Sequence, residues 1–240
     1  MATDDGPGVT RAWEEHAEEW ARWARAPGHD SYWRFHRDRF LALVPPPGRL
    51  TLDVGCGEGR LARDLRALGH RVVAVDASPT LARLAAEADP ELEVVVADAA
   101  SLPFADGAAD LAVAFMSLMD MDDMAAAGRE LGRVVEPGGR VVVALVHPVN
   151  SAGTFADEDD PETPFVLRDS YFEARRYVDV LERDGLTMTF ETLHWPLEAY
   201  VACLTDTGFL VEAIREVTDE SQPRWRRIPM FLHVRAVRAA

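Results

Sequence analysis

Two short segments of the sequence decide the fold. Residues 50–60 read Leu-Thr-Leu-Asp-Val-Gly-Cys-Gly-Glu-Gly-Arg, and residues 71–76 read Arg-Val-Val-Ala-Val-Asp. This pattern predicts a buried strand, a glycine loop, a helix, and a second buried strand that ends at a carboxylate. Glycines remove Cβ atoms where a chain turns sharply or approaches a ligand, and the first turn of a helix offers free N–H groups. A ribosyl ligand laid across this turn would place its hydroxyls against Asp76.

The spacing of the glycines narrows the kind of ligand. Gly55, Gly57 and Gly59 form a G-x-G-x-G pattern. A dinucleotide site typically has G-x-G-x-x-G. The spacing therefore argues against a nicotinamide dinucleotide and against the oxidoreductases that use it. A tight turn in an ordinary βαβ unit, with no ligand, is the alternative interpretation.

The two segments together resemble motif I of the class I S-adenosylmethionine (SAM) methyltransferases. The resemblance is specific because strand, glycine triplet, helix, strand and acid occur in order within one short unit. It implies that SAM is the cofactor and that Asp53, Gly55 and Gly57 bind it. It also implies that Asp76, with the adjacent Ala77, holds the ribose.

Later segments extend this resemblance over about residues 50–146. Glu93 to Ala97 form a β-branched run that ends at Asp98, and the family's third strand ends in an acid that binds the adenine amino group. The resemblance implies that the side chain of Asp98 and the backbone of Ala99 read the adenine edge. A turn cap formed by Asp98 is the alternative. The Glu-Pro-Gly-Gly sequence at 136–139 resembles the turn before the family's fifth strand.

The fourth predicted strand, residues 110–115, leads to the mouth of the sheet. Ligands of open α/β sheets lie beyond the carboxyl ends of the strands, which places Met116, Ser117 and Met119 near the reacting methyl group. We assign Met116 to the cofactor, and Ser117 and Met119 to the substrate. The Asn/Asp-Pro-Pro-Tyr/Phe motif of base-modifying DNA methyltransferases and some protein-glutamine methyltransferases is absent here, which argues against those targets.

Composition excludes several classes of partner. The formal net charge is −16, and all 25 basic residues are arginine. We expect no nucleic-acid partner, because phosphate backbones are met by clustered positive charge. Cys56 and Cys203 are the only cysteines, which gives neither a disulfide framework nor a metal site. No segment has the length and apolarity of a signal peptide or a membrane span. We expect a cytoplasmic protein without membrane contact, as a monomer or homodimer.

The order of predicted elements indicates an α/β fold. We expect a Rossmann-like sheet of seven mostly parallel strands with helices on both faces and an antiparallel last strand. The 240 residues are expected to form a single methyltransferase domain. Its parts would be an N-terminal helical lid (10–44), a SAM-binding core (45–148), a substrate-capping β-hairpin insertion after the fifth strand (149–195), and a C-terminal helix with antiparallel strands (196–240).

The N-terminal region is unusually aromatic. We expect disorder over residues 1–9, a helix from near Thr10, and a second helix over residues 31–44. Packing of its tryptophans against the core is one interpretation, and a lid over cofactor and substrate is the other. Because similar methyltransferases place N-terminal helices over the site, the resemblance implies that Tyr32 contacts SAM and that Trp33 contacts the substrate.

Methyl transfer from a sulfonium is an in-line displacement, so much of the rate can come from alignment in a dry cavity. A phenol or hydroxyl acceptor gains from a base, whereas an amine with a free lone pair needs only desolvation and alignment. His147 and His194 are the candidate bases because each ends a predicted strand that borders the insertion. A structural histidine is the alternative for each. Tyr171 begins an odd-numbered hairpin face that either lines the substrate pocket or faces solvent.

These observations predict a SAM-dependent methyltransferase that acts on a nitrogen or oxygen atom of a small molecule, such as a natural-product intermediate. A protein or peptide methyltransferase is the first alternative, and an open groove would favour it over a capped pocket. A non-catalytic SAM-binding regulatory protein is the second alternative.

Overall fold

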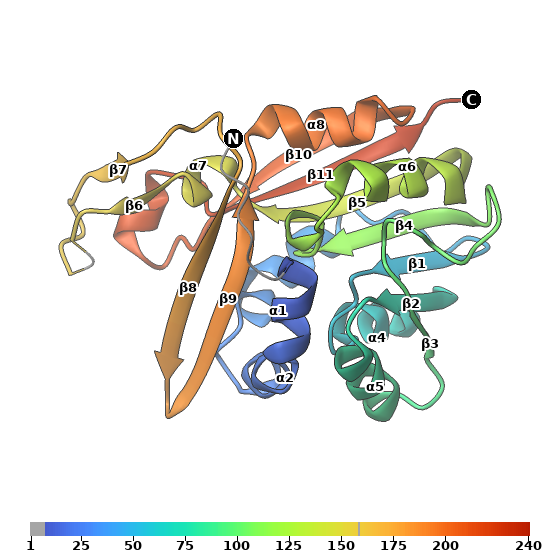
Figure 1. Cartoon of the computed structure of the whole chain (residues 1–240), viewed down its shortest axis with the longest axis horizontal. Helices are drawn as coiled ribbons and strands as arrows, with labels where there is room; N and C mark the ends of the chain where they lie inside the picture. The colour runs from blue at the N-terminus through green and yellow to red at the C-terminus, as the bar shows by residue number, and fades with distance from the viewer. Residues whose placement is uncertain (1–7, 158) are drawn as a thin grey trace.

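A central sheet of seven strands organises the structure, a computed structural model that describes residues 8–157 and 159–240 (Figure 1). Its strand order is β10-β11-β5-β4-β1-β2-β3. Strands β1 to β5 run parallel to one another, and β11 runs antiparallel to its two neighbours, β10 and β5. This confirms the predicted Rossmann-like sheet with an antiparallel last strand. The strands are β1 (Thr51–Val54), β2 (Val72–Asp76), β3 (Glu93–Val96), β4 (Ala109–Phe115), β5 (Val135–Val146), β10 (Phe209–Val217) and β11 (Phe231–Arg238).

Helices cover both faces of the sheet, which is why every residue of β1 and β2 is buried. One buried cluster joins the sheet to α6 and α8, and a second joins it to α3, α4 and α5. The covering helices are α3 (Arg37–Leu41), α4 (Arg60–Ala67), α5 (Pro79–Ala88), α6 (Met124–Val134) and α8 (Leu197–Thr205).

The N-terminal region begins with α1 (Val9–Glu15) and α2 (Ala17–Arg25), which contact α5 and the hairpin strand β9 (Figure 1). Helix therefore begins at Val9, within the stretch expected to be disordered, and residues 1–7 lie outside the described residues. The single helix expected over 31–44 is instead a π-helical turn, η1 (Tyr32–His36), followed by α3. A π-helical turn changes the direction in which successive side chains point.

The insertion after β5 is larger than a single hairpin. It contains α7 (Pro148–Ser151) and a small antiparallel pair, β6 (Gly153–Phe155) with β7 (Phe165–Leu167), which the sequence did not predict. The long hairpin follows, with β8 (Arg175–Arg183) paired to β9 (Leu186–His194). Figure 1 shows this hairpin extending from the sheet alongside α1 and α2.

The remaining short elements are η2 (Leu118–Asp120), directly after β4, and η3 (Pro223–Arg226), between β10 and β11. Within the described residues, no helix combines the length and the apolarity needed to cross a membrane.

Candidate active site

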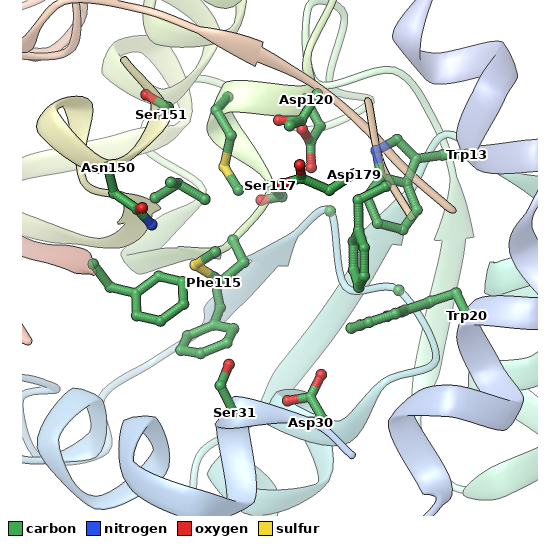
Figure 2. Close-up of a pocket in the computed structure, with 18 of the residues that line it drawn as sticks. Trp13, Trp20, Asp30, Ser31, Phe115, Ser117, Asp120, Asn150, Ser151 and Asp179 are labelled. Atoms are coloured by element: carbon green, nitrogen blue, oxygen red, sulfur yellow. The ribbon is translucent and has the colours of Figure 1, made fainter. Parts of the chain in front are cut away.

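A cavity of about 840 Å³ lies at the carboxyl ends of β1, β2 and β4. Its walls also include side chains from α1, α2, the segment after β5, and the hairpin β8–β9. Figure 2 shows Phe115 and Ser117 at the end of β4, with Trp13 and Trp20 reaching in from the N-terminal helices. The sheet therefore supplies one side of the cavity, and the N-terminal helices and the insertion supply the other.

The glycine loop fits closely against the end of β4. Gly55 has a φ of +73°, and a Cβ atom on it would lie 2.4 Å from the Cβ atom of Ser117. Ser117 Oγ donates a hydrogen bond to the carbonyl of Val54 at 2.7 Å. Glycine is required at residue 55 both by the backbone angle and by this contact. Gly55, Gly57 and Ser117 all line the cavity.

Asp76 is buried at the end of β2, and its carboxylate binds backbone N–H groups of the neighbouring loops. Its Oδ2 atom accepts a hydrogen bond from the N–H of Gly57 at 2.7 Å, and its Oδ1 atom accepts one from Ser78 at 2.9 Å. Burial raises the pKa of Asp76 to about 6, although these two hydrogen bonds act in the opposite direction. A carboxylate has about four acceptor positions, so Asp76 keeps acceptors for a ligand. It lines the cavity together with Ala77.

Asp53 is the second buried carboxylate of this site, and only 1% of its surface is exposed. Its Oδ2 atom is buried and has no hydrogen-bond partner. Burial, followed by repulsion from Asp76, raises the pKa of Asp53 to about 7. A buried carboxyl oxygen without a donor is costly. Since Asp53 lines the cavity, a ligand with an N–H donor would satisfy it.

The remaining predicted residues of this side also line the cavity. They are Asp98 and Ala99 after β3, and Met116 and Met119 after β4. Asp98 is exposed and accepts a hydrogen bond from the N–H of Ala100 at 2.8 Å, which is the turn cap considered as the alternative. One oxygen of Asp98 therefore shapes the turn, while the residue still borders the cavity next to Ala99.

Comparison with known proteins agrees with this geometry. Residues 52–143 match the family model of a methyltransferase domain. Over these residues the chain matches a methyltransferase domain, in agreement with the class I SAM-dependent methyltransferases that its motifs resemble.

Two curated relatives and one solved structure illustrate how far the similarity extends. A demethylmenaquinone methyltransferase of Beutenbergia cavernae is 38% identical over 117 residues, which is 49% of this chain and 48% of the relative. One from Mycolicibacterium paratuberculosis is 39% identical over 116 residues, which is 48% of this chain and 49% of the relative. The chain thus spans about half the length of these relatives. A SAM-dependent methyltransferase structure from Mesorhizobium loti has a TM-score of 0.68 and 24% identity, covering 84% of this chain and 96% of that one, and it shares the fold.

SAM is the cofactor of this family, and the residues of this chain fit it. The unpartnered Oδ2 atom of Asp53 suits the ammonium group of an amino-acid moiety. Asp76 retains acceptors for ribose hydroxyls, and Asp98 with Ala99 borders the place where an adenine edge would lie. These assignments remain predictions of our sequence analysis, now supported by a shared cavity.

The N-terminal helices are tied over the cofactor side of the methyltransferase cavity. Glu14 of α1 accepts hydrogen bonds from Thr80 Oγ1 at 2.7 Å, from the Thr80 N–H at 3.2 Å, and from the Ser78 hydroxyl. Arg25 of α2 pairs with Glu58 of the glycine loop at 2.9 Å. These contacts connect α1 and α2 to the segments that follow β1 and β2. Helices packed against the domain would make the same contacts, so the lid stays a prediction.

The structure does not bring Tyr32 or Trp33 into the cavity lining. Tyr32 is fully buried, and its hydroxyl donates to Asp64 Oδ2 at 2.6 Å, while the guanidinium of Arg60 lies 4.8 Å from its ring centre. Trp33 is 50% exposed at the surface. The π-helical turn that carries both residues points them away from where a regular helix was expected to direct them. Trp13 and Trp20 line the cavity instead.

Neither candidate histidine faces the cavity. His147 Nδ1 accepts a hydrogen bond from the N–H of Val149 at 3.1 Å, and its Nε2 atom lies 3.3 Å from Glu216. His194 is fully buried, with Nδ1 bound to Ser151 Oγ at 2.7 Å and Nε2 to the Tyr171 carbonyl at 2.9 Å. Burial lowers the pKa of both imidazoles. The geometry matches the structural alternative for each, so we do not assign proton removal to them.

The hairpin does present one face to the cavity. The odd-numbered residues of β8 line it, from Arg175 through Tyr177 and Asp179 to Arg183. Tyr171 precedes β8, so the alternation of the strand does not apply to it. Its hydroxyl accepts a hydrogen bond from the N–H of Leu197 at 3.1 Å instead. The odd-face pattern therefore holds from the point where the strand begins.

Asp120 is the most distinctive site residue that our sequence analysis missed. It follows the end of β4 in η2 and lines the cavity beside Trp13 of α1 and Thr192 of β9. Burial raises the pKa of Asp120 to about 8, although Thr192 and Trp13 act in the opposite direction. Asp120 directly follows Met119, which the sequence had already assigned to the substrate. This position was the signal that could have identified Asp120 as a site residue.

Across residues 8–157 and 159–240, no cluster of three or more histidine, cysteine, aspartate or glutamate side chains could hold a metal ion.

Proposed function

We propose that this protein transfers the methyl group of SAM to a nitrogen or oxygen atom of a small molecule. The observation that carries the proposal is the single cavity. It joins the glycine loop, Asp76 and Asp98 to a second compartment between η2, the N-terminal helices and the hairpin. An acceptor in that compartment would lie beyond the end of β4, next to Met116 and Ser117.

The roof of the cavity supports a small acceptor rather than a protein or peptide. At the tip of the hairpin, Arg183 Nη1 donates to the carbonyl of Gly28 at 2.8 Å, and the carbonyl of Arg183 lies 3.1 Å from His29 Nε2. These bonds tie the hairpin to the segment between α2 and η1. An extended peptide would need an open groove at this place.

Bound SAM supplies a methyl group on a positively charged sulfur. The residues of the chain provide the alignment: the interlocked Gly55 and Ser117 fix the loop against the end of β4, and the aromatic side chains Trp13 and Trp20 exclude water. Alignment and desolvation of this kind contribute several kcal/mol, on the order of 7–11, in well-oriented reactions.

The names of the relatives suggest carbon as another candidate for the acceptor atom. Demethylmenaquinone methyltransferases act on a ring carbon, so a carbon acceptor on a hydroxylated ring is the second candidate. The relatives cover only about half of this chain, and substrate choice depends on the N-terminal helices and the insertion. A SAM-binding regulatory protein without turnover is the third candidate.

Calorimetric titration with SAM, S-adenosylhomocysteine (SAH) and NAD in parallel tests the cofactor. We expect the two adenosyl-sulfur ligands to bind and NAD not to bind. Mass spectrometry then tests turnover on small molecules, where one added methylene group gives a +14 Da product. Fragmentation of that product distinguishes nitrogen, oxygen and carbon acceptors. Binding of SAH with no product from any acceptor would favour the regulatory protein, and binding of NAD alone would overturn the proposal.

A further inference from the structure

The acceptor compartment has a polar centre at Asp120. Figure 2 shows Asp120 and Asp179 directed toward the space between Ser117 and Trp13. Trp13 comes from α1, Asp120 from η2, Thr192 from β9, and Asp179 from β8. Four elements that are distant in sequence therefore meet around one carboxylate.

Asp120 Oδ1, Thr192 Oγ1 and Trp13 Nε1 are buried here and form no hydrogen bond of good geometry, although Thr192 and Trp13 lie close enough to Asp120 to lower its pKa. Thr192 is only 5% exposed, so water reaches its hydroxyl poorly. Buried polar groups in folded proteins are nearly always paired. Asp120 Oδ1 is a buried acceptor without a well-placed donor on the wall of a cavity, and it therefore indicates the place of a donor group of a ligand.

Asp120 is the acidic group of this centre, and it carries a negative charge once it is ionised, at a pH above its pKa of about 8. No ion pair to Asp120 is formed within the part of the chain that the structure describes, residues 8–157 and 159–240. The titratable groups that face it are Tyr177 and Asp179 from β8 and Tyr200 from α8, and burial, reinforced by the charge of Asp120, raises the pKa of both tyrosine hydroxyls. A buried carboxylate is stable when a cation pairs with it. Arg60, which lies 4.8 Å from the Trp20 ring centre, and Arg175 also line the cavity, but they pair with Asp30 and Asp169. A ligand is therefore the source we infer for a cation at Asp120.

The walls around Asp120 are aromatic. The rings of Trp13 and Trp20 are 5.8 Å apart, and Phe190 lies 6.3 Å from Trp13 and 5.8 Å from Trp20, all edge to face. All three side chains line the cavity. Aromatic faces attract cations and cover apolar bodies. A carboxylate inside such walls fits an ammonium group carried on an aromatic or aliphatic skeleton.

We propose that the methyl acceptor is a small amine with an apolar body, that Asp120 binds it as an ammonium ion, and that Asp120 then takes the proton that must leave before methylation. This inference rests on the proposed function, because it names the acceptor of the same site. It also gives the cavity the proton acceptor that His147 and His194 do not provide.

The step balances in atoms and charge. The ammonium N–H bond breaks, its proton passes to the carboxylate of Asp120, and its electron pair remains on nitrogen as a lone pair. That lone pair forms the new N–C bond to the methyl carbon, while the C–S bond breaks and its electrons remain on sulfur. The products are a methylated ammonium ion, neutral sulfur in SAH, and protonated Asp120, which releases its proton when the product leaves.

The first test measures binding to the wild-type protein saturated with SAH. Phenethylamine and phenethyl alcohol are matched probes that differ only in the polar group, together with a panel of aryl and alkyl amines and their matching alcohols. We expect members of the amine panel to bind at least about 10-fold more tightly than their alcohols by calorimetry. Equal binding of amines and alcohols, or binding by no amine of the panel, would overturn the inference.

Variants then locate the binding group. Asp120→Asn preserves shape and removes the charge, and we expect it to weaken amine binding and the turnover of amines about 100-fold while SAH affinity changes less than about 2-fold. Thr192→Val, which keeps the shape and removes the hydroxyl, should weaken amine binding about 3- to 10-fold. Asp206→Asn, an equivalent change at an exposed aspartate at the end of α8, is the control and should leave both values unchanged.

A pH profile separates proton transfer from simple structural support. For the wild-type protein, kcat/KM for an amine should rise with pH through the pKa of Asp120, about 8, because the protonated carboxyl cannot accept the ammonium proton. This rise of kcat/KM with pH should disappear in Asp120→Asn. An unchanged profile in that variant would overturn the role of Asp120 even if the amine still binds.

The two proposals fail in different ways. If neither SAM nor SAH binds, the proposed function itself is wrong. If both bind and the products are exclusively O- or C-methylated, the methyltransferase proposal stands and the amine inference is overturned.

Discussion

The two sides of the cavity are built by different means. On the cofactor side, the decisive groups act on the backbone of adjacent loops: Asp76 holds the N–H groups of Gly57 and Ser78, and Gly55 fits against Ser117. On the acceptor side, the groups are side chains brought together from α1, η2 and the hairpin. The first arrangement joins the ends of neighbouring strands of the sheet, and the close contact of Gly55 with Ser117 leaves little room for change. The second depends on how distant elements pack and allows substitution, so the acceptor can change while the cofactor does not.

The largest expected effect tests how rigid the cofactor side is. Gly55→Ala combines a disfavoured positive φ with a 2.4 Å contact to Ser117, and we expect it to destabilise the protein by about 2–6 kcal/mol in urea denaturation. Gly138→Ala is the matched control, because Gly138 also has a positive φ, +81°, but has no atom within 4 Å of the added methyl group. It should cost only about 1–2 kcal/mol. Equal costs would mean that the contact with Ser117 is unimportant.

The next effect tests the ribose assignment. Asp76→Ala should weaken SAH binding by about 2–4 kcal/mol, because it removes a carboxylate that accepts hydrogen bonds and supports the N–H of Gly57. Calorimetry of SAH measures this directly. Asp76→Asn keeps the shape of the side chain, and its SAH affinity should lie between that of the wild-type protein and that of Asp76→Ala. A dissociation constant that is the same in all three proteins would remove Asp76 from the cofactor site.

These residues also show how much the sequence could predict. The glycine loop, Asp53 and Asp76 lie at the ends of the buried strands β1 and β2, and Asp98 follows the edge strand β3. The fold alone determines these positions, and all of them line the cavity. His147 also ends a strand, but Val146 faces the cavity and side chains alternate along a strand. His147 therefore points to Glu216 on β10 instead. A difference of one residue in register cannot be read from strand position alone.

The acceptor side was less predictable for a different reason. The side chains around Asp120 come from α1, η2, β8 and β9, and no local pattern states that these segments meet. The π-helical turn at Tyr32 likewise has no distinct sequence signal, and it determines where Tyr32 and Trp33 point. Only the alternation of β8 could be used in advance, and it applies from Arg175 onward.

A third effect uses pH to examine Asp53. Its pKa is raised by burial from 3.8 to about 7, so unfolding releases its proton between these values and the wild-type protein without ligand loses stability as pH rises through this range. Asp53→Asn lacks this loss and should gain up to about 4 kcal/mol relative to wild type by pH 7, where each kcal/mol corresponds to about 2–4 °C in Tm. Thermal denaturation at several pH values measures the difference. Saturating SAH should reduce it, and a pH-independent difference would contradict the assignment.

The smallest effect concerns the histidines. His147→Ala should change kcat less than about 3-fold, because its ring nitrogens contact Val149 and Glu216 outside the cavity. Loss of its bond to the start of α7 should lower stability by about 1 kcal/mol. Steady-state kinetics with SAM and an accepted substrate provides the measurement. A loss of kcat above 100-fold with unchanged SAH affinity would restore this imidazole as the base.

The bonds of Glu14 to Ser78 and Thr80 have a consequence for the timing of the reaction cycle. They fasten α1 to the first turn of α5, directly after Asp76, so the cofactor side is covered by a segment that is not part of the sheet. We predict that exchange of SAH for SAM requires α1 to detach, whichever acceptor was methylated. The cycle therefore contains a step with the same rate for every acceptor, and the fastest substrates should all converge on one maximal turnover number.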